Sequence, residues 1–381
     1  MPTGTIHGMV VCGDTNRPAR GAFVMIGHTP SANGEVSNDL GPSGMVRTGM
    51  DGSYTVSNVP AGDYGVVALL PGYLSPFQNL SSNDVDGGNT DAVFAKRFAA
   101  AGVVTVSANQ TVTHDVTLTR GATISGRVLY SDGSPATQVT IAVENINTKA
   151  SKPRAGQPDV DFDVLMRTFF THQTNATDDE GHFRISGIAP GTYRVAAVSA
   201  SSSDLDGNAR NGIFIFPGML NDGLHVYSGD TLHKNAAKTY ALRPSDDITG
   251  VDIIIPLNAL HQVHGVLAAE DGRIINAAAL TLTDTTDESL HFSAKPSDNG
   301  TFTFSTVPAG TYKLAASGAR IMAPFPNQAA DSYGPKHPAN AFADADTTLI
   351  VKDSDLLDVS LLLTEVPLPK DERLDSQPPP Q

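Results

Sequence analysis

Histidine and serine residues could carry catalysis or bind a metal, and their spacing argues against both. None of the eleven histidines is followed three residues later by glutamate, the pair with which many zinc peptidases bind their metal. His261 and His264 have the nearest metal-like spacing, but residues three apart on a strand point to opposite faces. No Gly-x-Ser-x-Gly elbow, phosphate-binding loop or His-Glu-x-x-His motif occurs either. The sequence therefore predicts no catalytic residue, no metal and no cofactor.

Two acidic segments and one cysteine could also bind a metal or react. Asp84–Gly88 and Asp204–Asn208 contain the carboxylates that calcium prefers, but both lack the glycine position and the terminal glutamate of an EF-hand loop. We interpret them as acidic loops, with calcium binding as the alternative. The single cysteine, Cys12, follows Val10 and Val11, and we expect it to be a small buried residue on a strand.

Aromatic residues occur in three long segments, 69–103, 200–247 and 317–348, which separate more regular patterns. Loops of this length inside compact domains are uncommon unless they are functional or disordered. An exposed ring can stack on a sugar or anchor a protein partner. The predicted ligand-binding residues are Tyr73, Phe77, Phe214, Phe216, Tyr227, Phe325 and Tyr333. The alternative is that these rings fold back and cap a β-sandwich, and the absence of tryptophan counts against a dedicated polysaccharide binder.

The elements around these segments repeat three times. Asp51–Tyr64 reads Asp-Gly-Ser-Tyr-Thr-Val-Ser-Asn-Val-Pro-Ala-Gly-Asp-Tyr, and related sequences stand at Glu180–Tyr193 and Asn299–Tyr312. The copies lie 129 and 119 residues apart, which is the size of a domain and too long for a solenoid repeat. We therefore predict three homologous domains. Their boundaries are 1–120, 121–258 and 259–366, and a disordered tail follows at 367–381.

Short alternating strands surround each copy of the repeat. Opening strands are expected at Thr5–Val11, Thr123–Leu129 and Gln262–Leu267, and second apolar strands at Ala22–Ile26, Val139–Val143 and Ala279–Thr283. Within the repeat, apolar residues alternate with polar ones on both sides of a Pro-Ala-Gly or Ala-Pro-Gly turn, which predicts a β-hairpin. A closing strand ends each domain. Many short strands with frequent turns are typical of an all-β protein built from β-sandwiches, and the short linkers predict a semi-rigid rod.

The complete pattern resembles a known family. Gly-x-Val, a turn proline, a strand and then Asp-Gly-x-Tyr…Pro-Ala-Gly-x-Tyr-x-Val-x-Ala resembles the carboxypeptidase regulatory-like domain, in three copies that cover all but the tail. The resemblance implies three tandem transthyretin-like, or prealbumin-like, seven-stranded β-sandwiches, a fold also grouped with the starch-binding-like fold. It implies an accessory domain without catalysis. It also implies a secreted, periplasmic or cell-surface protein, although no signal peptide is visible in the sequence as given.

Composition limits the partners. The net charge is −15, and no run of lysine or arginine interrupts it, so nucleic acid and anionic membranes are unsuitable partners. No apolar run approaches the ~18 residues of a transmembrane helix. The first hypothesis is therefore a non-enzymatic binding protein that recognises a polysaccharide or a cell-surface protein through loops at the sandwich ends. The alternative is a structural spacer or assembly protein of the cell envelope. Oligomeric state stays open.

Overall fold

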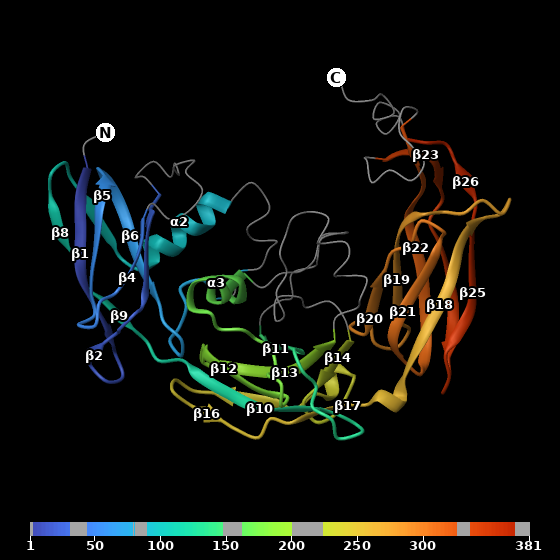
Figure 1. Ribbon diagram of the computed structural model, residues 1–381, viewed down its shortest axis with the longest axis horizontal. Helices are drawn as coiled ribbons and strands as arrows, with labels where there is room; N and C mark the ends of the chain where they lie inside the picture. Colours follow the sequence, from blue (N-terminus) through green and yellow to red (C-terminus); the bar gives the residue numbers. More distant parts are fainter. Residues whose placement is uncertain are drawn as a thin grey trace.

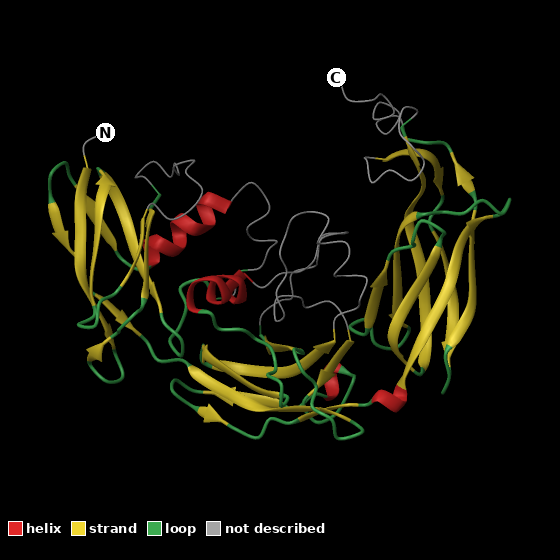
Figure 2. Cartoon of the chain, in the orientation of Figure 1, coloured by secondary structure: helices red, strands yellow, loops and turns green. Residues whose placement is uncertain are grey.

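The computed structural model is built mainly from β-strands, which confirms the all-β fold class (Figures 1 and 2). It describes residues 3–30, 44–78, 80, 90–147, 162–199, 224–325 and 336–369. All strand pairings among these residues stay within one of three stretches, 3–118, 122–255 and 260–366, here named the first, second and third units. The units follow the boundaries that the repeats predict. The division of the chain into three domains stays a prediction, which this pairing pattern favours.

The first unit contains two sheets. One sheet has β1 at its centre; its strands are β1 (Thr3–Cys12), β2 (Arg17–Pro18), β5 (Ser53–Pro60), β8 (Thr111–Thr113) and β9 (Val116–Leu118). The other has the order β4 (Gly44–Arg47), β3 (Phe23–His28), β6 (Gly62–Leu69), β7 (Val103–Val106). Ile6 and Val10 of the first sheet pack against Val24 and Val66 of the second. The unit is therefore a β-sandwich.

The second unit repeats this plan. Its first sheet contains β10 (Ala122–Tyr130), β12 (His182–Ile188), β16 (Asp247–Ile248) and β17 (Ile253–Ile255). Its second sheet contains β11 (Thr140–Asn145), β13 (Gly191–Ser199), β14 (Leu224–Tyr227) and β15 (Thr239–Leu242). The helix α3 (Phe162–Thr171) lies between β11 and β12 in sequence, and the short helix η1 (Lys234–Ala236) lies between β14 and β15.

The third unit follows after the short helix η2 (Leu257–Ala259). Its first sheet has the order β21 (Thr301–Pro308), β18 (Leu260–Ala269), β25 (Leu356–Leu363). Its second sheet contains β19 (Ala277–Asp284), β20 (His291–Ala294), β22 (Gly310–Pro324), β23 (Lys336–Phe342), β24 (Ala345–Val351) and β26 (Glu365–Val366). The opening strands are β1, β10 and β18, the first strands of the repeat are β5, β12 and β21, and the closing strands are β9, β17 and β25. In every unit the opening strand pairs antiparallel with the first strand of the repeat and parallel with the closing strand.

The predicted hairpin within the repeat is wrong. β5 pairs with β1, whereas β6 pairs with β3, so the two strands of the repeat belong to opposite sheets. The same holds for β12 with β13 and for β21 with β22. Alternation showed correctly that each strand buries one face. It could not show that the two buried faces meet the core from opposite sides, with the turn carrying the chain from one sheet to the other.

In the first and third units, a tyrosine stabilises the turn that carries the chain from one sheet to the other. The hydroxyl groups of Tyr64 and Tyr312 donate to the backbone oxygens of Pro60 and Pro308, both at 3.0 Å. Each tyrosine is fully buried, so the bond holds the turn against the core without competition from water.

Replacing Tyr312 by phenylalanine is expected to lower the free energy of unfolding of the third unit by about 1 kcal/mol. The ring still fills its place, but the buried oxygen of Pro308 loses its donor. Hydrogen exchange of β22 amides in increasing urea measures the change. An unchanged exchange profile would contradict a role for this hydroxyl group in the turn.

Two helices cover a second apolar face of the first unit. Met25, Val67 and Leu69 point away from the sandwich core and pack with residues of α2 (Thr90–Ala100), and Met166 and Phe170 of α3 pack against the same group. Both faces of β3 and β6 are therefore buried, which explains their continuous apolar runs. The expectation of an irregular segment at 69–103 is wrong over α2. The segments 200–247 and 317–348 likewise contain strands where they are described.

The three units form an arc, and α2 and α3 lie on its inner side (Figures 1 and 2). The rod shape predicted from the short linkers is therefore wrong, whereas the semi-rigid character stays a prediction. The reason lies in the junction of the first two units, where α3 of the second unit packs against the sheet of β3 and β6. The Phe23 and Phe170 rings stack at 4.4 Å, and Arg47 Nη2 donates to the Phe170 oxygen at 3.1 Å.

Candidate functional site

Tyr73 lies at the junction of the first two units and is buried. Its hydroxyl group donates to Asp14 Oδ1 at 2.9 Å, and the Arg120 guanidinium lies 5.1 Å from the ring centre. Burial is the main cause that raises the pKa of Tyr73 above its ordinary value. The neighbouring backbone is tied to the linker, because Leu74 N–H donates to the Thr119 oxygen at 2.9 Å. The ring thus stabilises the junction and offers no free face to a ligand.

Phe77 is buried beneath α2, with an exposed fraction of 1%. Its ring meets the Phe94 and Phe98 rings edge-on, at 5.7 Å and 6.3 Å between centres. These contacts place Phe77 in the cluster that joins β3, β6 and α2. The alternative from the sequence, in which loop aromatics fold back onto the sandwich, describes this residue.

Tyr227 is buried in the second unit, on β14. Burial and the nearby Glu144 carboxylate raise the pKa of its hydroxyl group. Glu144 Oε2 also lies 2.5 Å from Lys234 Nζ. Next to this group, His233 Nδ1 lies 3.2 Å from Asp287 Oδ2 of the third unit, so the cluster borders the junction between the second and third units.

The remaining predicted binding residues differ in position. Phe325 is half-buried at the end of β22, and its ring lies 5.1 Å from that of His337 on β23. Phe214, Phe216 and Tyr333 lie outside the described residues. The structure therefore does not bring the four described candidates together into one site. A sugar needs an accessible ring face, and among the described candidates only Phe325 keeps part of one.

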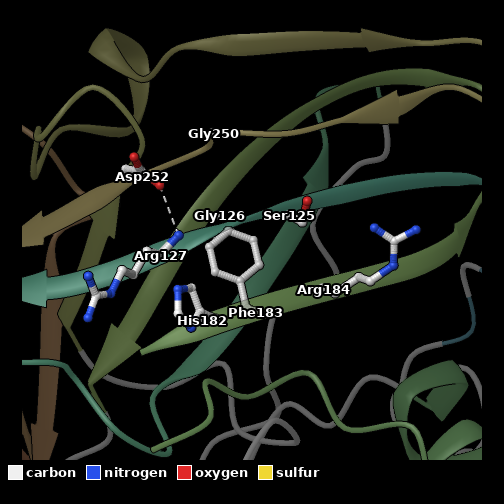
Figure 3. A pocket seen from close by; sticks show the side chains of 8 residues that line it. All are labelled: Ser125, Gly126, Arg127, His182, Phe183, Arg184, Gly250 and Asp252. Carbon is white, nitrogen blue, oxygen red and sulfur yellow. Dashed lines mark hydrogen bonds between the residues drawn. The ribbon is translucent and has the colours of Figure 1, made fainter. Parts of the chain in front are cut away.

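A shallow depression of about 510 Å³ lies on the outer face of the sheet of β10 and β12 (Figure 3). Its lining residues are Ser125, Gly126, Arg127, His182, Phe183, Arg184, Gly250 and Asp252. The sequence motifs did not predict this depression. The signal was present in the second repeat, which places arginine and histidine where the other copies carry small polar residues.

The arginine and histidine side chains of this depression already have partners. Arg184 Nη2 lies 3.2 Å from Asp247 Oδ2, and His182 Nδ1 lies 3.5 Å from Glu180 Oε2. Arg127 donates from Nε to the Glu180 oxygen at 2.9 Å. These contacts are more than half exposed, where ion pairs contribute little to stability or to binding. The depression offers hydrogen-bond donors to solvent, and its residues form no nucleophile and base pair.

The other sequence candidates also have structural roles or lie outside the described residues. Cys12 is buried in the core of the first unit, as predicted. His261 is buried, whereas the ring of His264 lies 2.9 Å from Thr303 Oγ1 on β21. Among the described residues, no group of three histidine, cysteine or carboxylate side chains could hold a metal ion. The acidic segments at 84–88 and 204–208 are not among the described residues.

The described part of the chain contains no helix with the length and apolar character needed to cross a membrane. No family model matches the sequence, so membership of the carboxypeptidase regulatory-like family stays a prediction. A comparison with curated proteins also finds no match.

Solved structures resemble the chain only distantly. A streptococcal ancillary pilin aligns at 10% identity with a TM-score of 0.25, over 96% of this chain and all of the pilin. The minor pilin of Streptococcus agalactiae aligns at 11% identity with a TM-score of 0.27, over 65% of this chain and 98% of the pilin. The TIE protein of Bacillus anthracis aligns at 11% identity with a TM-score of 0.21 over 95% of this chain, which spans 51% of that protein. With scores this low, these similarities indicate no function for this chain.

Proposed function

We propose that the protein is a non-enzymatic structural component of the cell envelope, which acts as a spacer that holds β-sandwiches in a fixed arc. The observation that carries this proposal is the burial of Tyr73, Phe77 and Tyr227, because the rings expected to bind a ligand stabilise the fold instead. Location outside the cytoplasm rests on the family resemblance. The charge of −15 keeps such a protein soluble.

The junction between the first two units supports a fixed spacing. Domains joined only by a linker move relative to each other by default, unless an apolar interface holds them. Here Phe170 stacks on Phe23 and Arg47 bonds to the backbone of α3. Gln78 Nε2 adds a bond to the Gly187 oxygen at 3.1 Å. The two hydrogen bonds join side chains of the first unit to the backbone of the second, and the stacked rings add an apolar contact.

Spin labels in the first and second units test the fixed spacing. The wild-type chain is expected to give one narrow distance distribution between the labels. The double variant Arg47→Ala and Phe170→Ala is expected to broaden it, because the stacked ring and the backbone bond are both lost. Phe169→Ala is the matched control, since this neighbour on α3 is 53% exposed. A broad distribution in the wild-type chain would contradict the spacer.

Carbohydrate or partner recognition is the second candidate, and the half-buried Phe325 beside His337 favours it. A glycan array with the intact chain and with Phe325→Ala separates the two functions. A glycan that binds the wild-type chain and loses affinity with the variant would support recognition at this end of the third unit. Absence of any glycan ligand would favour the spacer.

A further inference from the structure

In the second unit, strands lie along the whole outer edge of β13. The first half of β13 pairs with β15 from Gly191 to Arg194, and the second half pairs with β14 from Ala196 to Ser199. In the third unit, β24 alone pairs with β22 from Gly310 to Ala316, and β23 pairs farther along the strand, from Arg320 to Pro324. In both units, strands therefore pair with this edge at the tyrosine of the repeat and at the residues that follow it.

Among the described residues, the corresponding edge in the first unit is paired over only half of its length. β7 pairs with β6 from Gly62 to Gly65, and no strand among the described residues pairs with the rest of that edge of β6. Tyr64 of β6 corresponds to Tyr193 of β13 in the repeat, so Val66 to Leu69 occupy the positions at which β13 begins to pair with β14. Within the described part of the chain, the first unit has no strand at the position that β14 occupies in the second unit and that β24 covers in the third.

The part of this edge that follows Gly65 directs backbone N–H and C=O groups away from β3. The Asp63 oxygen accepts from Thr29 N–H at 3.2 Å on the β3 side, so by alternation Val66 and Ala68 direct their N–H and C=O groups to the other side. The second unit agrees, because the oxygen of Val195, which corresponds to Val66, accepts from Ser228 N–H just beyond β14 at 2.8 Å. Within the described part of the chain, no backbone bond from this side reaches Val66 or Ala68. Buried backbone groups of this kind are normally paired.

A cavity of about 300 Å³ lies at this edge. It extends from Val66, Val67 and Ala68 of β6 to two other segments, the turn at 74–76 and the closing strand at 114–119, with Ala101 beside them. The lining combines a strand edge, apolar surface from Leu74 and Pro76, and polar side chains of the closing strand.

We propose that this cavity is a binding site for an extended segment of a partner protein, which pairs antiparallel with β6 between Val66 and Leu69. In the second unit the strand at this position turns Leu224 and Val226 into the core, where both are fully buried. The partner segment is therefore expected to carry apolar side chains at alternate positions. Main-chain hydrogen bonds to a sheet edge supply affinity, and alternate side chains supply specificity. The site goes beyond the spacer function and does not depend on it.

A synthetic peptide with the sequence of residues 222–229, which contains β14, is the probe. We expect it to bind the full-length chain and to slow hydrogen exchange at Val66 and Ala68, the amides that face the cavity. N-methylation of the peptide at the valine that corresponds to Val226 is expected to weaken binding at least about tenfold, because that nitrogen loses the hydrogen that pairs with the edge.

Ala101→Trp is the blocking variant, since Ala101 lines the cavity and is exposed. Ala100→Trp is the matched control, because this exposed neighbour at the end of α2 does not line the cavity. Binding that Ala101→Trp abolishes and Ala100→Trp retains supports the site. Equal binding to both variants, or no binding at about 1 mM peptide, overturns it. Dimerisation that Ala101→Trp prevents would overturn a separate partner in favour of a second copy of this chain.

Discussion

Replacing Phe77 by alanine is expected to lower the free energy of unfolding of the first unit by about 3–5 kcal/mol. The ring is 1% exposed and lies between Phe94, Phe98 and the outer face of β6. Its removal leaves a cavity beneath α2 that neither the helix nor the sheet can close without losing other contacts. Urea-dependent hydrogen exchange of β6 and α2 amides measures this change separately from the other units.

This result decides between the two functions that the sequence suggested for Phe77. A ligand-binding ring would reduce binding when truncated and leave the stability unchanged. A structural ring reduces the stability and acts on binding only through the fold. Met50→Ala is the control in the same unit, since Met50 is 79% exposed and its loss should cost less than about 0.5 kcal/mol. Equal stability of Phe77→Ala and Met50→Ala would return Phe77 to the list of candidate binding residues.

The strands of the sandwiches could be predicted from the sequence because each buries one face. Opening, second and closing strands appear where the alternation and the turns predict them. The sheet to which a strand belongs could not be predicted in the same way. Tyr54 and Tyr64 both point into the core of the first unit, but one does so from the sheet of β1 and the other from the sheet of β3. Period-two alternation is identical in both cases.

The helices were missed, although the sequence contains their signal. Gly27 and Gly65 lie opposite each other on β3 and β6, and an added Cβ at either would lie within 2.3 Å of Phe98 on α2. The other repeats carry Arg194 and Lys313 where the first carries Gly65, and no helix among the described residues makes a comparable contact with β13 or β22. Continuous apolar residues in β3 and β6 are the second signal, since both faces are covered.

The candidate site could be predicted less well, for a physical reason. An aromatic residue in a long segment can be exposed to bind a ligand or buried to cap the sandwich. The residue type does not distinguish these two roles. The contacts of Tyr73 show that its ring is structural. Its partners Asp14 and Arg120 are distant in sequence and contact it only in the folded protein. The edge of β6 that no described strand covers beyond Gly65 could not be predicted either, because the alternation of apolar residues does not show which distant strands pair.

Replacing Gly8 by alanine is expected to have the other large effect, a decrease of about 3 kcal/mol in the free energy of unfolding of the first unit. A Cβ at this position would lie 1.8 Å from the His114 oxygen, so the closing strand would have to move away from β1. That oxygen also accepts from the Tyr54 hydroxyl group at 2.6 Å. Met9 N–H bonds to Asp115 Oδ1 at 2.8 Å, so the displacement would break both contacts and the pairing of β8 and β9 with β1.

The opening-strand glycine is predicted to matter equally in the other units, because Cβ atoms at Gly126 and Gly265 would lie 2.0 and 2.4 Å from the backbone oxygens of Val251 and Val359. Gly49→Ala is the control in the first unit. It is exposed, and the nearest atom to its added Cβ is a side-chain oxygen of Asp51 at 3.0 Å, so a change below about 1 kcal/mol is expected. Hydrogen exchange of β1 amides in urea compares the two variants. If Gly8→Ala were as stable as Gly49→Ala, the closing strand would pack more loosely than these distances imply. The glycine of the opening strand would then need another explanation.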